Sequence, residues 1–278
     1  MTIIDAQIHL WEADRPDRPW PPSERVNISR DSSYSVEQML QEMEKTGVDR
    51  AVVVPPSWIG ENNATALEAA AHYPDRFAVM GRFDPKLLGA KDQLEHWREQ
   101  PHLLGIRMTF LGAFTEWLED GSIEWFWDTC ERANIPVMVL VAGICSKIVP
   151  VAARHPGLKL IIDHMACDLR GKADAAFLEF DSLLSLAMYP EVRVKVSSAP
   201  CFSAEPYPFR DIEPYLHRIF DSFGARRLMW GADLAPRLTS TYQECLDHFR
   251  FGLPFLNEQD KDWILGRTTA ETLGWPID

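Results

Sequence analysis

The feature that most constrains the fold of this chain is a regular alternation of strand-like and helix-like segments along its length. Eight short runs are rich in β-branched and other apolar residues, as expected of strands that are covered on both faces. They occupy residues 3–11, 50–54, 77–80, 104–110, 136–141, 158–164, 192–197 and 227–233. Eight βα units in 278 residues predict an α/β fold, a single (β/α)8 TIM barrel over residues 1–278. A doubly wound open sheet is the alternative.

Local signals mark several of the intervening helices. Ser35 followed by Gln38 predicts a capping box, and Gly47 suits the position just after the helix that they begin. Ser122 is a candidate N-cap for a later helix. After the last strand, residues 240–251 and 258–265 have the pattern of two further helices.

One connection is too long and irregular to be a minimal βα loop. Residues 12–34 are rich in proline and arginine and include Trp20. We expect this long loop to lie over the barrel mouth as a lid or specificity element. A packed surface excursion without a role is the alternative.

Composition excludes several classes of partner. The chain has 28 basic and 41 acidic side chains and a net charge of −13, which repels nucleic acids and anionic membranes. Its 5 cysteines lack CxxC spacing, so we expect reduced thiols and neither a disulfide framework nor a cysteine zinc site. The sequence shows no signal-peptide pattern and no apolar run long enough to span a bilayer. We therefore expect a cytoplasmic protein with no membrane or nucleic-acid partner.

Polar side chains lie at or near the ends of several predicted strands. They are Gln7, His9, Arg107, His164, Lys195, Ser197 and Asp233. In a parallel barrel the C-terminal ends of the strands meet at one mouth, where chemistry is carried out, so we expect these side chains to form a site. Each has a structural alternative: an aspartate at a strand end often caps a helix, and Arg107 or Lys195 can simply pair with a buried carboxylate.

The same segments carry a family resemblance. Residues 5–11, DAQIHLW, resemble the opening motif of the amidohydrolase superfamily, in the amidohydrolase-related branch that includes pyrone-dicarboxylate lactonase and sugar lactonases. The elements GIR at 105–107, IDHM at 162–165, WGAD at 230–233 and LGWP at 273–276 resemble later motifs of that branch, in the same order. The resemblance spans the chain and implies a TIM-barrel hydrolase of catabolism.

The resemblance also raises the question of a metal ion. Members of the superfamily normally place His-x-His on the first strand, and this chain has Gln7 at the first of these positions. The predicted fifth strand, 136–141, lacks the histidine that metal-binding members use. What remains is His9, His164 and Asp233, with Gln7 as a weak neutral ligand, whereas a mononuclear site ordinarily needs three or four ligands. We expect no cofactor; the alternative is one Zn or Mn ion on His9, His164 and Asp233.

The lactonase branch implies hydrolysis of a lactone or an activated ester. Asp233 would act as general base toward water, and His9 and His164, with Gln7, would donate hydrogen bonds to the carbonyl oxygen. The predicted substrate-binding residues are Gln7, Trp11, Arg107, Lys195 and Ser197. Arg107 and Lys195 would hold a carboxylate, which points to a small anionic substrate.

Two other functions fit the same residues. One is a metal-dependent decarboxylase or hydratase of aromatic or unsaturated acids. The other is a non-catalytic binding protein with a decayed site, indicated by the missing motif histidine. The 10 tryptophans permit a homo-oligomeric interface but fit a core equally well.

Overall fold

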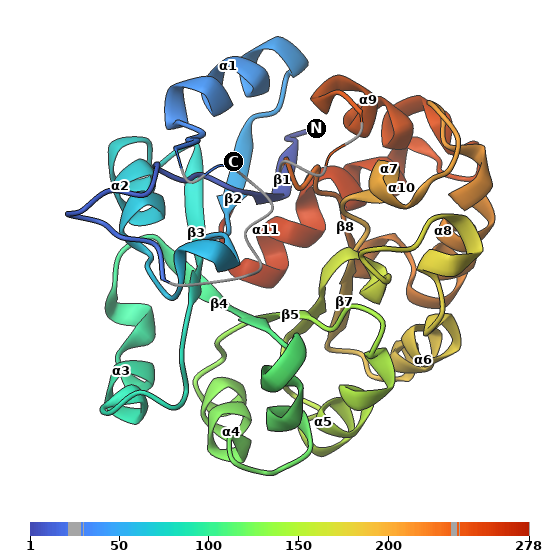
Figure 1. Ribbon diagram of the computed structural model, residues 1–278. Helices are drawn as coiled ribbons and strands as arrows, with labels where there is room; N and C mark the ends of the chain where they lie inside the picture. Colours follow the sequence, from blue (N-terminus) through green and yellow to red (C-terminus); the bar gives the residue numbers. More distant parts are fainter. Residues whose placement is uncertain (22–28, 30, 235–237, 239, 278) are drawn as a thin grey trace.

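The computed structural model describes residues 1–21, 29, 31–234, 238 and 240–277. Its centre is an 8-stranded sheet in which each strand pairs in parallel with the next along the chain. The strands are β1 (Ile4–Ile8), β2 (Arg50–Val53), β3 (Phe77–Arg82), β4 (Leu103–Thr109), β5 (Val137–Leu140), β6 (Leu160–Ile162), β7 (Val192–Lys195) and β8 (Leu228–Met229). The segment that follows β8 meets the first strand through a parallel bridge between Ile8 and Leu234. The predicted (β/α)8 barrel is confirmed (Figure 1).

Helices surround this ring of strands (Figure 1). They are α1 (Val36–Thr46), α2 (Ala64–His72), α3 (Ala90–Glu95), α4 (Glu124–Arg132), α5 (Val149–Arg154), α6 (Phe180–Ser185), α7 (Ala199–Phe202), α8 (Glu213–Phe223), α9 (Tyr242–Asp247), α10 (Glu258–Asp262) and α11 (Thr268–Leu273). The capping box of Ser35 and Gln38 is present at the start of α1, and Gly47 ends that helix with φ 77°. The prediction for Ser122 is wrong, because Ile123 precedes α4 and the Ser122 N–H donates instead to Asp120.

The apolar core has two layers, and the barrel interior is the smaller. Side chains that point into the barrel include Ile4, Val52, Met80, Met138 and Met229, and Leu273 of α11 packs against them. The alternate residues of the strands point outward and pack beneath the surrounding helices. Because α11 crosses the centre of the ring in Figure 1 and packs on this interior, it closes one end of the barrel. Polar side chains gather at the other end.

An irregularity in β1 decides which of its polar residues face that end. Strict alternation along the sequence 3–11 would place Asp5, Gln7 and His9 on one face, which is the arrangement expected of a regular strand. The pairing of β1 with β2 shifts register between Asp5 and Ile8. Ala6 packs in the interior, and the side chain of its neighbour Gln7 also reaches the interior, which a regular strand would not allow. Asp5 contacts Tyr242 of α9 outside the barrel. The expectation therefore holds for Gln7 and His9 and is wrong for Asp5.

The ends of the long loop at 12–34 are fixed to each other. Trp11 and Tyr34 exchange two backbone hydrogen bonds, of 3.2 and 2.9 Å. Residues 22–28 and 30 lie outside the described part of the chain, so the position of this loop over the mouth stays a prediction. None of the described helices is both long and apolar enough to cross a bilayer.

Candidate functional site

Asp233 lies at the centre of the polar group at the open end of the barrel. It follows β8, has a left-handed backbone with φ 54°, and its N–H donates to the Gln7 carbonyl at 2.9 Å. Its carboxylate accepts hydrogen bonds from Gln7 Nε2, at 3.1 Å, and from Ser198 Oγ. The same carboxylate is 3.0 Å from His9 Nε2. Residues that end β1 and follow β7 and β8 therefore meet at one carboxylate.

The backbone that follows β2 holds the ring of His9 in one orientation. The Nδ1 atom of His9 lies 2.6 Å from the carbonyl oxygen of Val54. Because a carbonyl oxygen can only accept, Nδ1 carries a hydrogen, and Nε2 is the atom that faces Asp233. At 3.0 Å the nitrogen and the carboxylate oxygen form a hydrogen bond only if a proton lies between them. Nε2 is therefore the atom through which His9 can exchange a proton with Asp233.

His164 approaches the same carboxylate from β6. It begins a turn, residues 164–166, in which all three residues have a left-handed backbone, with φ of 51°, 57° and 54°. Its Nδ1 lies 2.8 Å from Ser197 Oγ, and its Nε2 lies 3.5 Å from Gln7 Nε2. The distance from His164 Nε2 to Asp233 Oδ2 is 3.8 Å, too long for a direct hydrogen bond but suited to a bridging water.

Behind this cluster, two buried cations share one carboxylate. Lys195 Nζ contacts Asp163 Oδ1 at 2.7 Å and donates to Gln7 Oε1, and Arg107 Nε donates to Asp163 Oδ2 at 3.0 Å. Burial by itself raises the pKa of Asp163, but Lys195 and Arg107 outweigh it and hold that pKa below its ordinary value. Burial lowers the pKa of Lys195, against the opposing attraction of Asp163. Lys195, Arg107 and Asp163 thus form an ion-paired group that holds the side chain of Gln7 in position.

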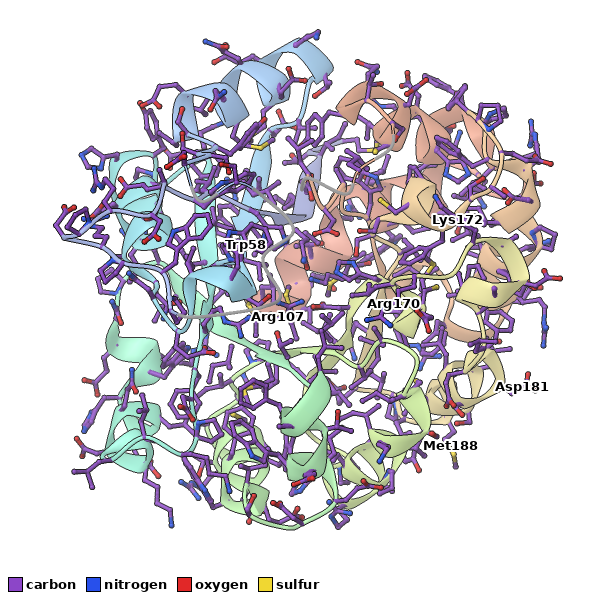
Figure 2. The ribbon with its side chains drawn as sticks, in the orientation of Figure 1. Trp58, Arg107, Arg170, Lys172, Asp181 and Met188 are labelled. Atoms are coloured by element: carbon purple, nitrogen blue, oxygen red, sulfur yellow. The ribbon has the colours of Figure 1, made fainter. Side chains whose placement is uncertain are left out.

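Three residues of the site were not predicted from the sequence. Ser198 donates to Asp233, and Asp5 accepts from the backbone N–H of Gln7 and of Ala232 at 2.9 and 3.1 Å. Trp58 lies in a short 3-10 helix after β2, with its ring centroid 6.0 Å from that of His9. Its buried Nε1 has no hydrogen-bond partner in the part of the chain that the structure describes. Figure 2 shows Trp58 and Arg107 toward the centre of the barrel, in contrast to Asp181 and Met188 at the periphery.

The predicted site residues take up different places. The catalytic candidates His9, His164 and Asp233 come together, and Gln7 joins them. Gln7, Lys195 and Ser197 are 0% exposed. In this structure they therefore contact other members of the cluster and have no surface open to a ligand. Trp11 does not reach the cluster: its ring contacts Tyr34 and Trp58, at centroid distances of 5.5 and 5.6 Å. Trp58 stands between Trp11 and His9.

The residues present do not suit a divalent metal ion. A zinc or manganese site needs several lone pairs directed at one point. Here Gln7 Oε1 is directed at the ammonium group of Lys195, and the amide N–H groups face Asp233 and His164 instead. Within the described ranges, no three His, Cys, Asp or Glu side chains are placed to hold an ion together. This donor set favours chemistry in which Asp233 and His9 act directly.

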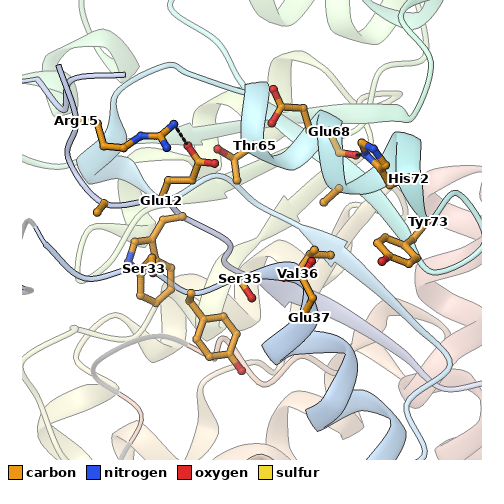
Figure 3. Close-up of a pocket in the computed structure, with 14 residues that line it drawn as sticks. Glu12, Arg15, Ser33, Ser35, Val36, Glu37, Thr65, Glu68, His72 and Tyr73 are labelled. Atoms are coloured by element: carbon orange, nitrogen blue, oxygen red, sulfur yellow. Dashed lines mark hydrogen bonds and ion pairs between the residues drawn. The ribbon is translucent and has the colours of Figure 1, made fainter. Parts of the chain in front are cut away.

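A separate hollow lies beside α1 and α2, outside the barrel (Figure 3). Its volume is about 530 Å³, and Trp11 is the site candidate among its lining residues. Glu12, Glu37 and Glu68 also line it, and Figure 3 shows the ion pair of Glu12 with Arg15, whose N and O atoms are 3.0 Å apart. Three carboxylates make this hollow a poor place for the predicted anionic substrate.

Comparison with known proteins agrees with this architecture. The sequence profile of the amidohydrolase family matches residues 4–275. An L-fucono-1,5-lactonase of Burkholderia ambifaria is 29% identical over 235 residues, which cover 83% of this chain and 79% of that protein. A 4-sulfomuconolactone hydrolase of Rhizobium radiobacter is 26% identical over 205 residues, or 71% of this chain and 65% of the relative.

Similarity to solved structures extends over the whole barrel. A crystal structure of a probable 2-pyrone-4,6-dicarboxylic acid hydrolase from Acinetobacter baumannii, with citric acid bound, superimposes with a TM-score of 0.80. The two sequences are 20% identical, and the match covers 99% of this chain and 100% of that one. At this identity the likeness supports the fold alone.

Proposed function

The chain belongs to the amidohydrolase family and is a hydrolase, and from this premise we propose that it opens a small lactone that carries an anionic group, without a metal ion. The two curated relatives are a sugar lactonase and a sulfomuconolactone hydrolase, which supports a lactone as the substrate. The observation that carries the proposal is the cluster itself: Asp233 follows β8, and His9, Gln7 and His164 surround its carboxylate.

We assign each of these side chains a role in the proposed reaction. We place the attacking water beside Asp233 Oδ2 and His164 Nε2, which are 3.8 Å apart, with one of its hydrogens directed at the carboxylate. Asp233 takes one proton as the water oxygen attacks the acyl carbon. The carbonyl oxygen becomes an oxyanion and accepts from the Nε2–H of His9, whose orientation Val54 fixes.

The second half of the reaction uses the same carboxylate. As the bond between the acyl carbon and the ring oxygen breaks, the proton on Asp233 passes to the departing ring oxygen. The product is a hydroxy acid, and Asp233 returns to its ionised form. The amide of Gln7 and the hydroxyl of Ser198 keep the carboxylate in position through both halves.

Support for an anionic substrate comes from Arg107. Its Nε is engaged by Asp163, while its two terminal nitrogens make no hydrogen bond to any residue that the structure describes. A guanidinium with two unused N–H edges suits a carboxylate or a sulfonate. The unpartnered indole N–H of Trp58, beside His9, supplies a further donor and an aromatic wall for a small ring.

The proposal is tested by assaying a lactone panel with wild type, Asp233→Asn and Asp181→Asn. The panel holds a neutral aldonolactone, a sulfonated muconolactone and a pyrone dicarboxylate, each assayed with and without chelator. We expect hydrolysis that is unaffected by chelator, faster for the anionic lactones, and reduced on the order of 10²–10⁴-fold in kcat by Asp233→Asn. Asp181 is 97% exposed, so its variant controls for loss of one carboxylate.

Two results would contradict the proposal. One is an Asp233→Asn enzyme whose kcat stays within about tenfold of wild type. The other is a protein that leaves the whole panel intact but, once loaded with metal, decarboxylates aromatic acids.

A further inference from the structure

A buried lysine stands next to the place where the superfamily resemblance implies a metal ion. We propose that Lys195 is a positioning residue that serves as the built-in cation of this site and, by fixing the amide of Gln7, keeps divalent ions out. The inference deepens the proposed function but stands on the hydrogen bonds of Lys195 and Gln7. Its test therefore reads metal content and does not depend on finding the substrate.

The ammonium group of Lys195 has three close contacts, one of them an ion pair. Its Nζ lies 2.7 Å from Asp163 Oδ1 and 3.2 Å from Met138 Sδ, and it donates to Gln7 Oε1. The side chain is 0% exposed, so no water competes for these positions. An ammonium group only donates, so the atom of Gln7 that faces it must be the carbonyl oxygen. The lysine thereby sets which way the amide points.

The other end of the amide then faces the cluster. Gln7 Nε2 lies 3.1 Å from Asp233 Oδ1 and 3.5 Å from His164 Nε2. Both of these atoms would be metal ligands in a zinc or manganese site, and each is instead directed at an N–H group. An ion at this point would meet the amide hydrogens at close range and the ammonium of Lys195 just behind them. A histidine at position 7 would offer a lone pair there; glutamine held by Lys195 offers hydrogens.

Lys195 and Gln7 also supply part of the positive charge that a metal ion would bring to the site. The positive charge of Lys195 reaches the reaction centre through the polarised amide of Gln7, whose N–H groups orient Asp233. Because Asp163 and Arg107 complete the charge-paired group, this cation is fixed in place before substrate arrives.

The first experiment replaces the amide by its isosteric acid, Gln7→Glu. A carboxylate keeps the bond to Lys195 but presents an oxygen lone pair to the cluster in place of the N–H groups. Wild type and variant are dialysed against excess Co²⁺ and then buffer, and bound cobalt is read by elemental analysis and by its visible absorption. We expect less than about 0.1 equivalent in wild type and about one equivalent in Gln7→Glu. About one equivalent in wild type, or no gain in the variant, would overturn the proposal.

The second experiment removes the cation itself. In Lys195→Met the amide of Gln7 is free to turn its oxygen toward the cluster, and a buried positive charge is lost. We expect cobalt binding to rise at least about tenfold over wild type. Lys159→Met, the same substitution at a lysine just before β6, is the matched control and should bind no more than wild type. A purely structural role for Lys195 would lower stability in the variant and leave its cobalt content equal to that of the control, which would overturn the inference.

Discussion

At the scale of single residues, Asp5 links the stability of the fold to pH. Its carboxylate lies outside the barrel wall, where Tyr242 of α9 donates to it at 3.0 Å and the N–H groups of Gln7 and Ala232 donate from β1 and from the segment after β8. Burial raises the pKa of Asp5 to about 7 from 3.8. The folded protein therefore holds this proton over a pH range in which the unfolded chain has released it.

The sign of the resulting pH dependence follows from linkage. Stability from protonated Asp5 is fully present below pH 3.8 and is lost as pH rises through about 7. Asp5→Asn keeps an oxygen for the two N–H donors and removes the titration. We predict that, from pH 5 to pH 8, the free energy of unfolding of wild type falls relative to that of the variant by about 3 kcal/mol. Urea denaturation at both pH values measures this, and equal pH dependence in the two proteins would contradict it.

Sequence reasoning found the members of the cluster that lie at strand ends and missed those placed by loop conformation. His9, His164 and Asp233 were predictable because parallel strands in a barrel bring their C-terminal ends together. Ser198 was not predictable, because its hydroxyl reaches Asp233 only through a left-handed backbone, φ 57°. The periodicity of apolar residues does not predict that conformation. Trp58 depends on a 3-10 turn for the same reason. Lys195 was recognised as a cation, but its bond to Gln7 depends on how side chains of β1 and β7, which are separated by β8, meet inside the barrel.

At the scale of elements, the helix α9 continues into a π-helical turn, His248–Gly252, that buries the ring of His248. The ring of His248 contacts Phe209 and Phe249, at centroid distances of 5.2 and 5.4 Å. Neither of its ring nitrogens has a hydrogen-bond partner among the described residues. A Cβ on Gly252 would lie 2.8 Å from His248 Cδ2, so the wide turn needs glycine at that position to make room for the ring.

This turn is predicted to be the acid-sensitive element of the fold. Burial, with a smaller effect from Arg210, lowers the pKa of His248 from 6.5 to about 4. The unfolded chain takes up this proton first, so stability falls as pH decreases from about 6.5 toward 4. Between pH 7 and pH 5 wild type should lose about 2 kcal/mol more than His248→Leu, as read from urea denaturation. If the variant loses as much stability as wild type, the loss has another origin.

At the scale of the whole molecule, the barrel was predictable from the count of strands, but its closure was not. The sequence predicts a last strand over residues 227–233, whereas β8 is Leu228–Met229. The Trp230 N–H donates to Ile264 of the C-terminal helical region, at 2.8 Å, and the Asp233 N–H donates to Gln7. The backbone of this segment therefore joins elements at both ends of the chain, while the Ser198 N–H, just after β7, still donates to Gly231 at 3.3 Å. Apolar patterning marks such a segment as extended without showing where its hydrogen bonds go.

The barrel keeps stability and chemistry at opposite ends, and this division is testable at α11. Leu273 is 1% exposed and packs on the interior residues of the barrel at the end closed by that helix. Removing its side chain leaves a cavity there, so Leu273→Ala should cost about 2–5 kcal/mol of unfolding free energy. The cluster around Asp233 lies at the other end, so kcat/KM of the folded variant should stay within about twofold of wild type. Leu88→Ala, at a fully exposed leucine, is the control and should change neither quantity. A tenfold loss of kcat/KM in a variant that remains folded would mean that packing at the closed end sets the geometry of the mouth.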